Sequence, residues 1–265
     1  MKNFLKAKKL QLVLIVISVL LSSFILKEAN KKPTLYLIGD STVKNGKGKG
    51  DNGLWGWGNF LSEHFDTTRI TIKNHALGGT STRTFQSKGL WDSVLTHLKP
   101  GDFVIMQFGH NDGSPLDDTA RARGTIKGIG AESKEIYNPI TKKQEVVYTY
   151  GWYLTKFIKD TKLKCATPLV CSPIPRNNWK DGKAVRATND YGQWAAETAK
   201  TNKAFFIDLN KLIADKYDQL GEQKVKSYFP KDHTHPNMEG SKLNASSVVE
   251  GLNGLRKCKL KKYLR

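Results

Sequence analysis

The sequence is organised around the stretch LYLIGDST at residues 35–42. Four consecutive apolar residues are typical of a short strand that is buried on both faces. The glycine and the polar residues after it predict a turn directly beyond that strand. Side chains just past the carboxyl ends of strands in an open α/β sheet line the ligand crevice. Ser41 is therefore expected where a hydroxyl group can meet a ligand.

Short apolar runs like this one recur along the chain and predict five strands. Amphipathic segments lie between them, which predicts an α/β fold with a parallel sheet covered by helices on both faces in one domain, residues 33–265. The strands are expected at Leu35–Ile38, Ile70–Lys73, Phe103–Gln107, Leu169–Ser172 and Phe205–Asp208. The helices are expected at Gly58–His64, Leu90–Leu98, Trp152–Lys164, Asp190–Thr201, Leu209–Leu220 and Met238–Leu252.

Residues 125–150 interrupt the alternation of strands and helices. The segment contains an Asn-Pro turn signal at 138–139 and the β-prone run Val146-Val147-Tyr148. We interpret it as an insertion with a short hairpin after the third strand. Loops at the carboxyl ends of strands line the crevice, so this insertion is expected to shape the substrate site.

The first 32 residues have the pattern of an export signal. Lysines at positions 2, 6, 8 and 9 precede residues 10–26, which carry no charge. No Ala-x-Ala-like cleavage site follows, so the segment is either a cleaved signal peptide or a retained membrane anchor. Both alternatives predict that the remainder is exported to the periplasm, the cell surface or the medium.

The formal net charge of +19 is high for 265 residues. It has two interpretations: a solvated surface that keeps the protein soluble, or attraction to a polyanion, which for an exported enzyme means an acidic polysaccharide or an anionic cell surface. No nucleic-acid-binding motif accompanies the charge, so nucleic acid is not an expected partner. Three cysteines are too few for a disulfide scaffold; Cys171 lies in an apolar run typical of a core, whereas Cys165 and Cys258 could pair.

The segment Asp232-His-Thr-His235 carries a second set of reactive groups. An aspartate three residues before a histidine can accept the imidazole Nδ1–H, which leaves Nε2 free to take a proton from serine. His235 has this offset from Asp232, whereas His233 is expected to be structural or to line the site. Metal binding through the His-x-His pair competes with this interpretation, but no third ligand is evident nearby.

Two further polar blocks follow expected strands. Residues 74–81 contain Gly78 and Gly79, which allow a backbone amide to approach a ligand closely. Asn111, in the block Gly-His-Asn-Asp at 109–112, can donate a hydrogen bond to a developing oxyanion. Taken singly, each block is also an ordinary turn. The pattern G-x-G-x-x-G at 48–53 stands too far beyond its strand for a dinucleotide site and is expected to be a loop beside Ser41.

Taken together and in order, these blocks resemble the SGNH, or GDSL-type, hydrolases, and among them enzymes like rhamnogalacturonan acetylesterase. The resemblance runs from about residue 34 to 249 and is carried by Gly-Asp-Ser-Thr at 39–42, Gly-Trp-Gly at 56–58, Gly-His-Asn-Asp at 109–112, Tyr-Phe-Pro at 228–230 and Asp-His-Thr-His at 232–235. It implies a flavodoxin-like three-layer α/β/α sandwich with a five-stranded parallel sheet.

The resemblance also implies roles for these residues. Ser41 would be the nucleophile, His235 the general base and Asp232 its orienting partner. The backbone amides of Ser41 and Gly79, with the Asn111 side chain, would form the oxyanion hole. No metal or organic cofactor is expected.

The implied substrate is an acetylated polysaccharide of the plant cell wall, most closely rhamnogalacturonan. The protein is expected to be a monomer. One alternative is an esterase for another acetylated glycan, such as xylan or a bacterial envelope polysaccharide. Another is a catalytically silent glycan-binding protein, which would not need both Ser41 and His235.

Overall fold

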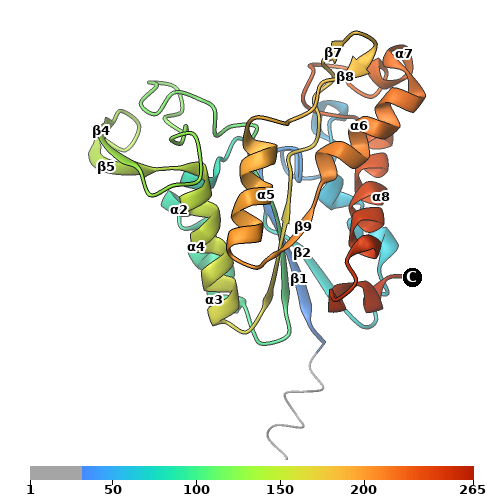
Figure 1. Ribbon diagram of the computed structural model, residues 1–265, viewed down its shortest axis with the longest axis horizontal. Helices are drawn as coiled ribbons and strands as arrows, with labels where there is room; N and C mark the ends of the chain where they lie inside the picture. Colours follow the sequence, from blue (N-terminus) through green and yellow to red (C-terminus); the bar gives the residue numbers. More distant parts are fainter. Residues whose placement is uncertain (1–31) are drawn as a thin grey trace, which may run out of the picture. The chain divides into compact units, whose positions relative to one another are not determined.

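A five-stranded parallel sheet forms the centre of residues 32–265, the part of the chain that the computed structural model describes (Figure 1). The strand order is β2-β1-β3-β6-β9, and every neighbouring pair is parallel. The prediction of a five-stranded parallel sheet is confirmed. Its strands are β1 (Thr34–Gly39), β2 (Thr71–Asn74), β3 (Phe103–Gln107), β6 (Thr167–Cys171) and β9 (Phe205–Ile207).

Helices cover both faces of the sheet (Figure 1). The side chains of β1 alternate between two apolar cores: Leu35 and Leu37 belong to one, Tyr36 and Ile38 to the other. This two-sided burial explains why the strand is a continuous apolar run. One face carries α2 (Thr82–Ser87), α3 (Leu90–His97), α4 (Tyr150–Leu163) and α5 (Tyr191–Thr201). The other carries α6 (Leu209–Leu220), α7 (Glu222–Lys226), α8 (Met238–Gly254) and η4 (Lys259–Tyr263).

The predicted helix at Gly58–His64 is wrong. The segment forms two 3-10 helices, η2 (Trp57–Asn59) and η3 (Leu61–His64). The backbone amide of Trp57 donates to the Thr42 carbonyl, and that of Gly58 donates to the Val43 carbonyl, both 3.0 Å away. Hydrogen bonds to the turn after β1 therefore determine the path of this segment, and they override its helical pattern.

Two antiparallel hairpins lie at the end of the sheet where β1 terminates (Figure 1). The first, β4 (Ser133–Asn138) with β5 (Lys143–Tyr148), confirms the predicted insertion and its hairpin. The second, β7 (Trp179–Lys180) with β8 (Lys183–Ala184), was not predicted, and neither were α2 and α7. Strands of two residues are too short to show a period in the sequence.

The suggested pairing of Cys165 with Cys258 is wrong, because both thiols are free. Cys165 is exposed in the turn between α4 and β6, whereas Cys258 belongs to the apolar core on the other face of the sheet. Cys171 is fully buried in that core, as predicted, and burial raises the pKa of its thiol.

The predicted signal peptide or anchor at residues 1–32 lies outside the described residues except for its last position. From residue 32 onward, no helix combines the length and apolar character needed to cross a membrane.

Candidate active site

The turn after β1 holds Ser41 at the edge of the sheet. The Asp40 carboxylate accepts hydrogen bonds from the Thr42 backbone amide at 2.9 Å and from its hydroxyl at 2.7 Å, which closes the turn. A Cβ atom at Gly39 would lie 2.5 Å from the Gln107 carbonyl oxygen, so only glycine lets β1 approach β3 here. The resulting geometry leaves the Ser41 side chain lining a cavity of about 690 Å³.

His235 meets Ser41 across the same cavity. Its Nε2 lies 2.8 Å from the Ser41 Oγ, although 194 residues separate the two in sequence. Its Nδ1 lies 2.8 Å from Oδ2 of Asp232, the carboxylate three residues earlier. The three side chains therefore form one continuous hydrogen-bonded line, in which Nδ1 donates to the carboxylate and Nε2 can accept from the serine hydroxyl.

The local backbone orients the Asp232 carboxylate. Its Oδ1 accepts the backbone amides of Thr234 at 2.7 Å and of His235 at 2.8 Å. Burial by itself would raise the pKa of Asp232, but the hydrogen bonds from the His235 ring and from these amides lower it below its ordinary value. The carboxylate is therefore ionised across the neutral range, as a partner for an imidazolium requires.

Hydrogen-bond donors line the cavity beside Ser41. Gly79 has a φ of +81°, in the left-handed region that favours glycine. The Asn111 side chain is buried and donates one N–H to the Thr80 carbonyl at 2.8 Å, which fixes the amide and leaves its second N–H for a ligand. Gly78 lines the cavity as well. The positions predicted for the oxyanion hole, Ser41, Gly79 and Asn111, thus line the same cavity.

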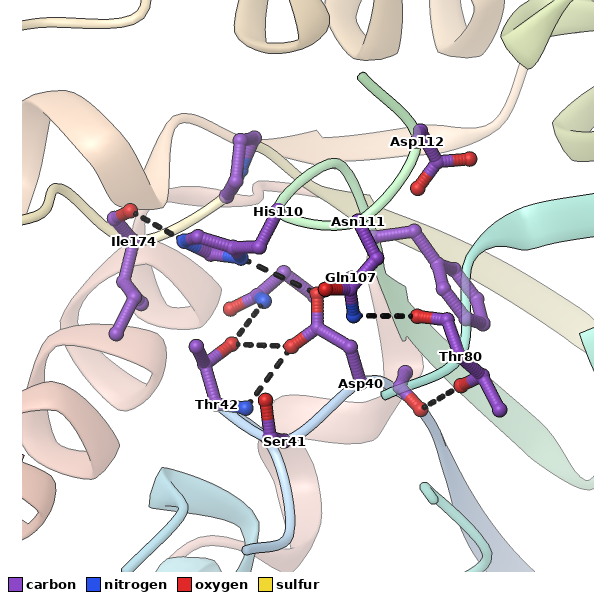
Figure 2. A network of polar contacts seen from close by, with 12 residues as sticks. Asp40, Ser41, Thr42, Thr80, Gln107, His110, Asn111, Asp112 and Ile174 are labelled. Carbon is purple, nitrogen blue, oxygen red and sulfur yellow. Dashed lines mark hydrogen bonds and ion pairs between the residues drawn. The ribbon is translucent and has the colours of Figure 1, made fainter. Parts of the chain in front are cut away.

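A network of buried polar side chains joins the residues beside Ser41 (Figure 2). The Gln107 side chain donates to the Thr42 hydroxyl at 2.6 Å, and that hydroxyl donates to Asp40. The other Asp40 oxygen lies 3.2 Å from His110 Nδ1, and His110 Nε2 lies 3.0 Å from the Ile174 carbonyl. The carboxylate and the carbonyl are both hydrogen-bond acceptors, so each suits a ring N–H as its partner. The loops after β1, β3 and β6 are thereby joined.

The same network reaches η2, because the Trp57 indole donates to the Gln107 side-chain oxygen at 2.8 Å. Burial alone would raise the pKa of Asp40, but the charge and hydrogen bond of His110 and the bonds from Thr42 lower it. Sequence reasoning assigned no role to Gln107 or His110. A polar residue ending an otherwise apolar strand was the available signal for Gln107.

Arg83 attaches the outer loops to the sheet domain. Its side chain is only 1% exposed and forms a two-pronged ion pair with Glu145 of β5, with N–O distances of 2.7 and 2.6 Å. Its Nη1 also donates to the carbonyls of Leu116 and Gly124, at 2.7 and 3.0 Å. One side chain on α2 therefore holds both the hairpin and the loop after β3 beside the cavity. Ile140, at the hairpin turn, lines that cavity.

His233 does not contact the serine. Its side chain is exposed, with Nε2 3.3 Å from Arg176 Nη1. Within the described part of the chain, no group of three or more His, Cys, Asp or Glu side chains is placed to hold a metal ion.

Several known proteins are similar to this chain in sequence and in fold. Residues 37–243 match the GDSL-like lipase/acylhydrolase family. The chain is 30% identical over 236 residues to a rhamnogalacturonan acetylesterase of Emericella nidulans, covering 89% of this chain and 91% of the relative. It is 27% identical over 241 residues to the rhamnogalacturonan acetylesterase RhgT of Bacillus subtilis, covering 85% of this chain and 92% of the relative.

Solved structures agree on the fold. The structure of YxiM from Bacillus subtilis superposes with a TM-score of 0.68 at 24% identity, covering 86% of this chain and 58% of YxiM. The acetylxylan esterase Axe2 of Geobacillus stearothermophilus superposes with a TM-score of 0.57 at 17% identity, covering 83% of this chain and 94% of Axe2. The sheet order, the family match across most of the domain and these relatives lead to one conclusion. The chain belongs to the GDSL-like lipase/acylhydrolase family, the SGNH hydrolases.

Proposed function

We propose that this protein is a serine esterase that removes acetyl groups from acetylated rhamnogalacturonan, a polysaccharide of the plant cell wall. The observation that carries the proposal is the 2.8 Å contact between Ser41 Oγ and His235 Nε2, in line with the Asp232 carboxylate. The relatives named rhamnogalacturonan acetylesterases support the choice of substrate.

The reaction follows from the positions of these groups. His235 Nε2 takes the Ser41 proton while Oγ attacks the acetyl carbonyl carbon, and Asp232 stabilises the imidazolium that forms. The negative charge that develops on the carbonyl oxygen is bound by the backbone amides of Ser41 and Gly79 and by the free Asn111 N–H.

The intermediate collapses when the bond between the acyl carbon and the sugar oxygen breaks and His235 donates its proton to that oxygen, which leaves as a hydroxyl group. An acetyl ester on Ser41 remains. His235 then deprotonates a water molecule, which attacks this ester and releases acetate. The serine hydroxyl is restored, and no cofactor takes part in any step.

The site of action is part of the proposal. The basic and apolar pattern of the first 32 residues supports export, which would bring the enzyme to polysaccharide outside the cytoplasm.

The test is acetate release by Ser41→Ala from acetylated rhamnogalacturonan and from a small acetyl ester. We expect a loss of roughly 10⁴-fold or more, because the nucleophile is absent. Ser93→Ala, at an exposed serine on α3, is the matched control and should keep full activity. Unchanged turnover by Ser41→Ala would refute the nucleophile. Full activity of the parent protein on acetylated xylan, with none on the pectic polymer, would refute the substrate.

A further inference from the structure

The cavity at Ser41 continues into a second one. The neighbouring cavity has a volume of about 570 Å³ and lies against the loops after β3 and β6. The two share the lining residues His110, Arg123 and Arg176. Each volume falls within the roughly 300–1,000 Å³ that is usual for ligand sites. A ligand whose reacting group sits at Ser41 can therefore extend past these two arginines.

The charges that line this groove are unbalanced. The cavity at Ser41 is lined by Lys88, Arg121, Arg123 and Arg176, and no Asp or Glu of residues 32–265 lines it. In the neighbouring cavity, the only acidic lining residue among those described is Asp190. Its carboxylate already caps the start of α5 by accepting the Gly192 amide at 3.2 Å.

The arginines that line the cavity at Ser41 differ from other arginines nearby, which are held in ion pairs. Arg83 is paired with Glu145, and Arg186, which also lines the second cavity, is paired with Asp215 at 2.8 Å and Asp218 at 2.6 Å. By contrast, none of the three arginines 121, 123 and 176 forms an ion pair with any carboxylate in the described part of the chain. No carboxylate of the described residues therefore lies within ion-pair distance of these guanidinium groups.

Neutral groups hold two of these guanidinium groups in place. Arg123 donates to the Ser114 hydroxyl at 3.1 Å and to the Gly79 carbonyl at 3.2 Å. Arg176 donates to the His110 carbonyl at 3.1 Å. Such acceptors orient a guanidinium without neutralising it. Burial lowers the pKa of Arg123 and the neighbouring charge of Arg121 lowers it further, while the carboxylates of Asp118, Asp40 and Asp112 act in the opposite direction. This mutual repulsion is relieved when an anion lies between the two.

We propose that Arg121, Arg123 and Arg176 form a subsite for the carboxylate of a uronate residue of the acetylated polymer. The proposal rests on the proposed function, since it places this carboxylate on the same polymer chain that is deacetylated at Ser41. Guanidinium groups suit this ligand because their planar donors match the two oxygens of a carboxylate. The high net charge would increase the encounter rate with such a polymer.

The first experiment measures ligand binding to a variant that lacks the proposed nucleophile. Calorimetry measures the affinity of unacetylated trigalacturonate for the Ser41→Ala protein, with and without Arg121→Gln or Arg176→Gln. We expect each neutral substitution to weaken binding roughly tenfold or more, because charge-assisted hydrogen bonds are lost. Arg256→Gln is the matched control: it removes the same charge from an exposed arginine in the C-terminal segment and should leave the affinity unchanged.

Kinetics test the position of the subsite relative to Ser41. With Ser41 intact, Arg121→Gln should raise KM for an acetylated oligogalacturonide and leave kcat almost unchanged. The KM for an acetylated xylo-oligosaccharide, which has no carboxylate, should rise far less. Arg121 is exposed, and its side chain forms no hydrogen bond or ion pair with the other described residues, so this variant is expected to fold normally. A similar loss on both substrates would instead indicate a general defect and overturn the subsite.

The outcomes separate the two proposals. If Arg121→Gln and Arg176→Gln bind trigalacturonate as tightly as the parent, or if Arg256→Gln binds as weakly as they do, there is no such subsite, whatever the esterase activity. If binding depends on these arginines but the parent protein releases no acetate from any ester, the subsite stands and the esterase is refuted.

Discussion

Ser41 and His235 illustrate what the geometry requires of single residues. For Nε2 to accept the serine proton, the imidazole proton must be on Nδ1, where Asp232 accepts it at 2.8 Å. The lowered pKa of Asp232 keeps that acceptor ionised. Two backbone amides direct the carboxylate at the ring. The tautomer of His235 is thus determined by contacts within four consecutive residues.

Asn111→Ala should lower kcat by roughly 10²- to 10³-fold and change KM little, because its free N–H is used chiefly when charge develops on the oxyanion. Steady-state kinetics on a model acetyl ester measure both constants. The variant also leaves the Thr80 carbonyl without its donor, so thermal unfolding must show that the fold is retained. A rise in KM at constant kcat would make Asn111 a contact of the ground-state substrate instead.

At the scale of elements, the site depends on strand ends that meet at one edge. In the order β2-β1-β3-β6-β9, the chain passes from β1 to β2 toward one edge of the sheet and from β3 to β6 toward the other edge. Connections that diverge in this way open a crevice between the carboxyl ends of β1 and β3. Ser41 follows β1 and Asn111 follows the neighbouring β3. The network from Gln107 through Asp40 to His110 then locks these two turns together (Figure 2).

The outer loops depend on Arg83 in α2. Arg83→Met should lower the free energy of unfolding by about 3–5 kcal/mol, because it leaves the partly buried Glu145 without its cation. Chemical denaturation measures this. The double variant Arg83→Met/Glu145→Leu should recover part of the loss, since it removes the unpaired charge.

The affinity for an acidic ligand gives a second measure of this ion pair. Arg83 holds the loop that carries Arg121 and Arg123, so Arg83→Met should also weaken binding of an acidic ligand. A loss of stability below about 1 kcal/mol, the level of an exposed ion pair, would contradict a structural role for Arg83.

At the scale of the whole molecule, residues 32–265 pack into two apolar cores separated by the sheet, with ionisable groups buried near the carboxyl ends of the strands. Asp112 is fully buried there; its Oδ1 accepts two hydrogen bonds from Thr82, at 3.0 and 2.6 Å, while its Oδ2 has no partner. Burial raises the pKa of Asp112 to about 7, and the charge of Asp40 adds to the rise. The folded protein therefore retains a proton that the unfolded chain releases at lower pH.

Global stability should consequently carry a contribution from Asp112 that is lost as the pH rises. The carboxyl group ionises near 3.8 in the unfolded chain and near 7 in the folded one, so its contribution declines between about pH 4 and pH 7. At ~1.4 kcal/mol per pH unit, the decline is on the order of 4 kcal/mol. Above pH 7 it is constant.

Asp112→Asn removes this titration and keeps an acceptor for Thr82. Urea unfolding at intervals from pH 4 to pH 8 should show a smaller loss of stability with rising pH in the variant than in the parent. The contributions of other groups cancel in the difference between the two curves. Parallel curves would mean that Asp112 ionises at its ordinary pH in the folded protein.

The sequence determined the features that depend on neighbours along the chain. Buried strands are continuous apolar runs, and the amphipathic periods of α3 to α6 and α8 are local, so the α/β class and most elements could be predicted. The contact of Asp232 with His235 is also local, because three residues suffice to close it. Motif order then allowed Ser41 and Asn111 to be singled out through family resemblance.

Only the tertiary structure decided what depends on distant parts of the chain. It placed Ser41 against His235 across 194 residues, turned Gly58–His64 into two 3-10 helices, and left Cys165 and Cys258 as free thiols. The unpaired state of Arg123 and Arg176 has the same origin. Whether a charge finds a partner depends on which segments pack beside it, and no local pattern of residues encodes that packing.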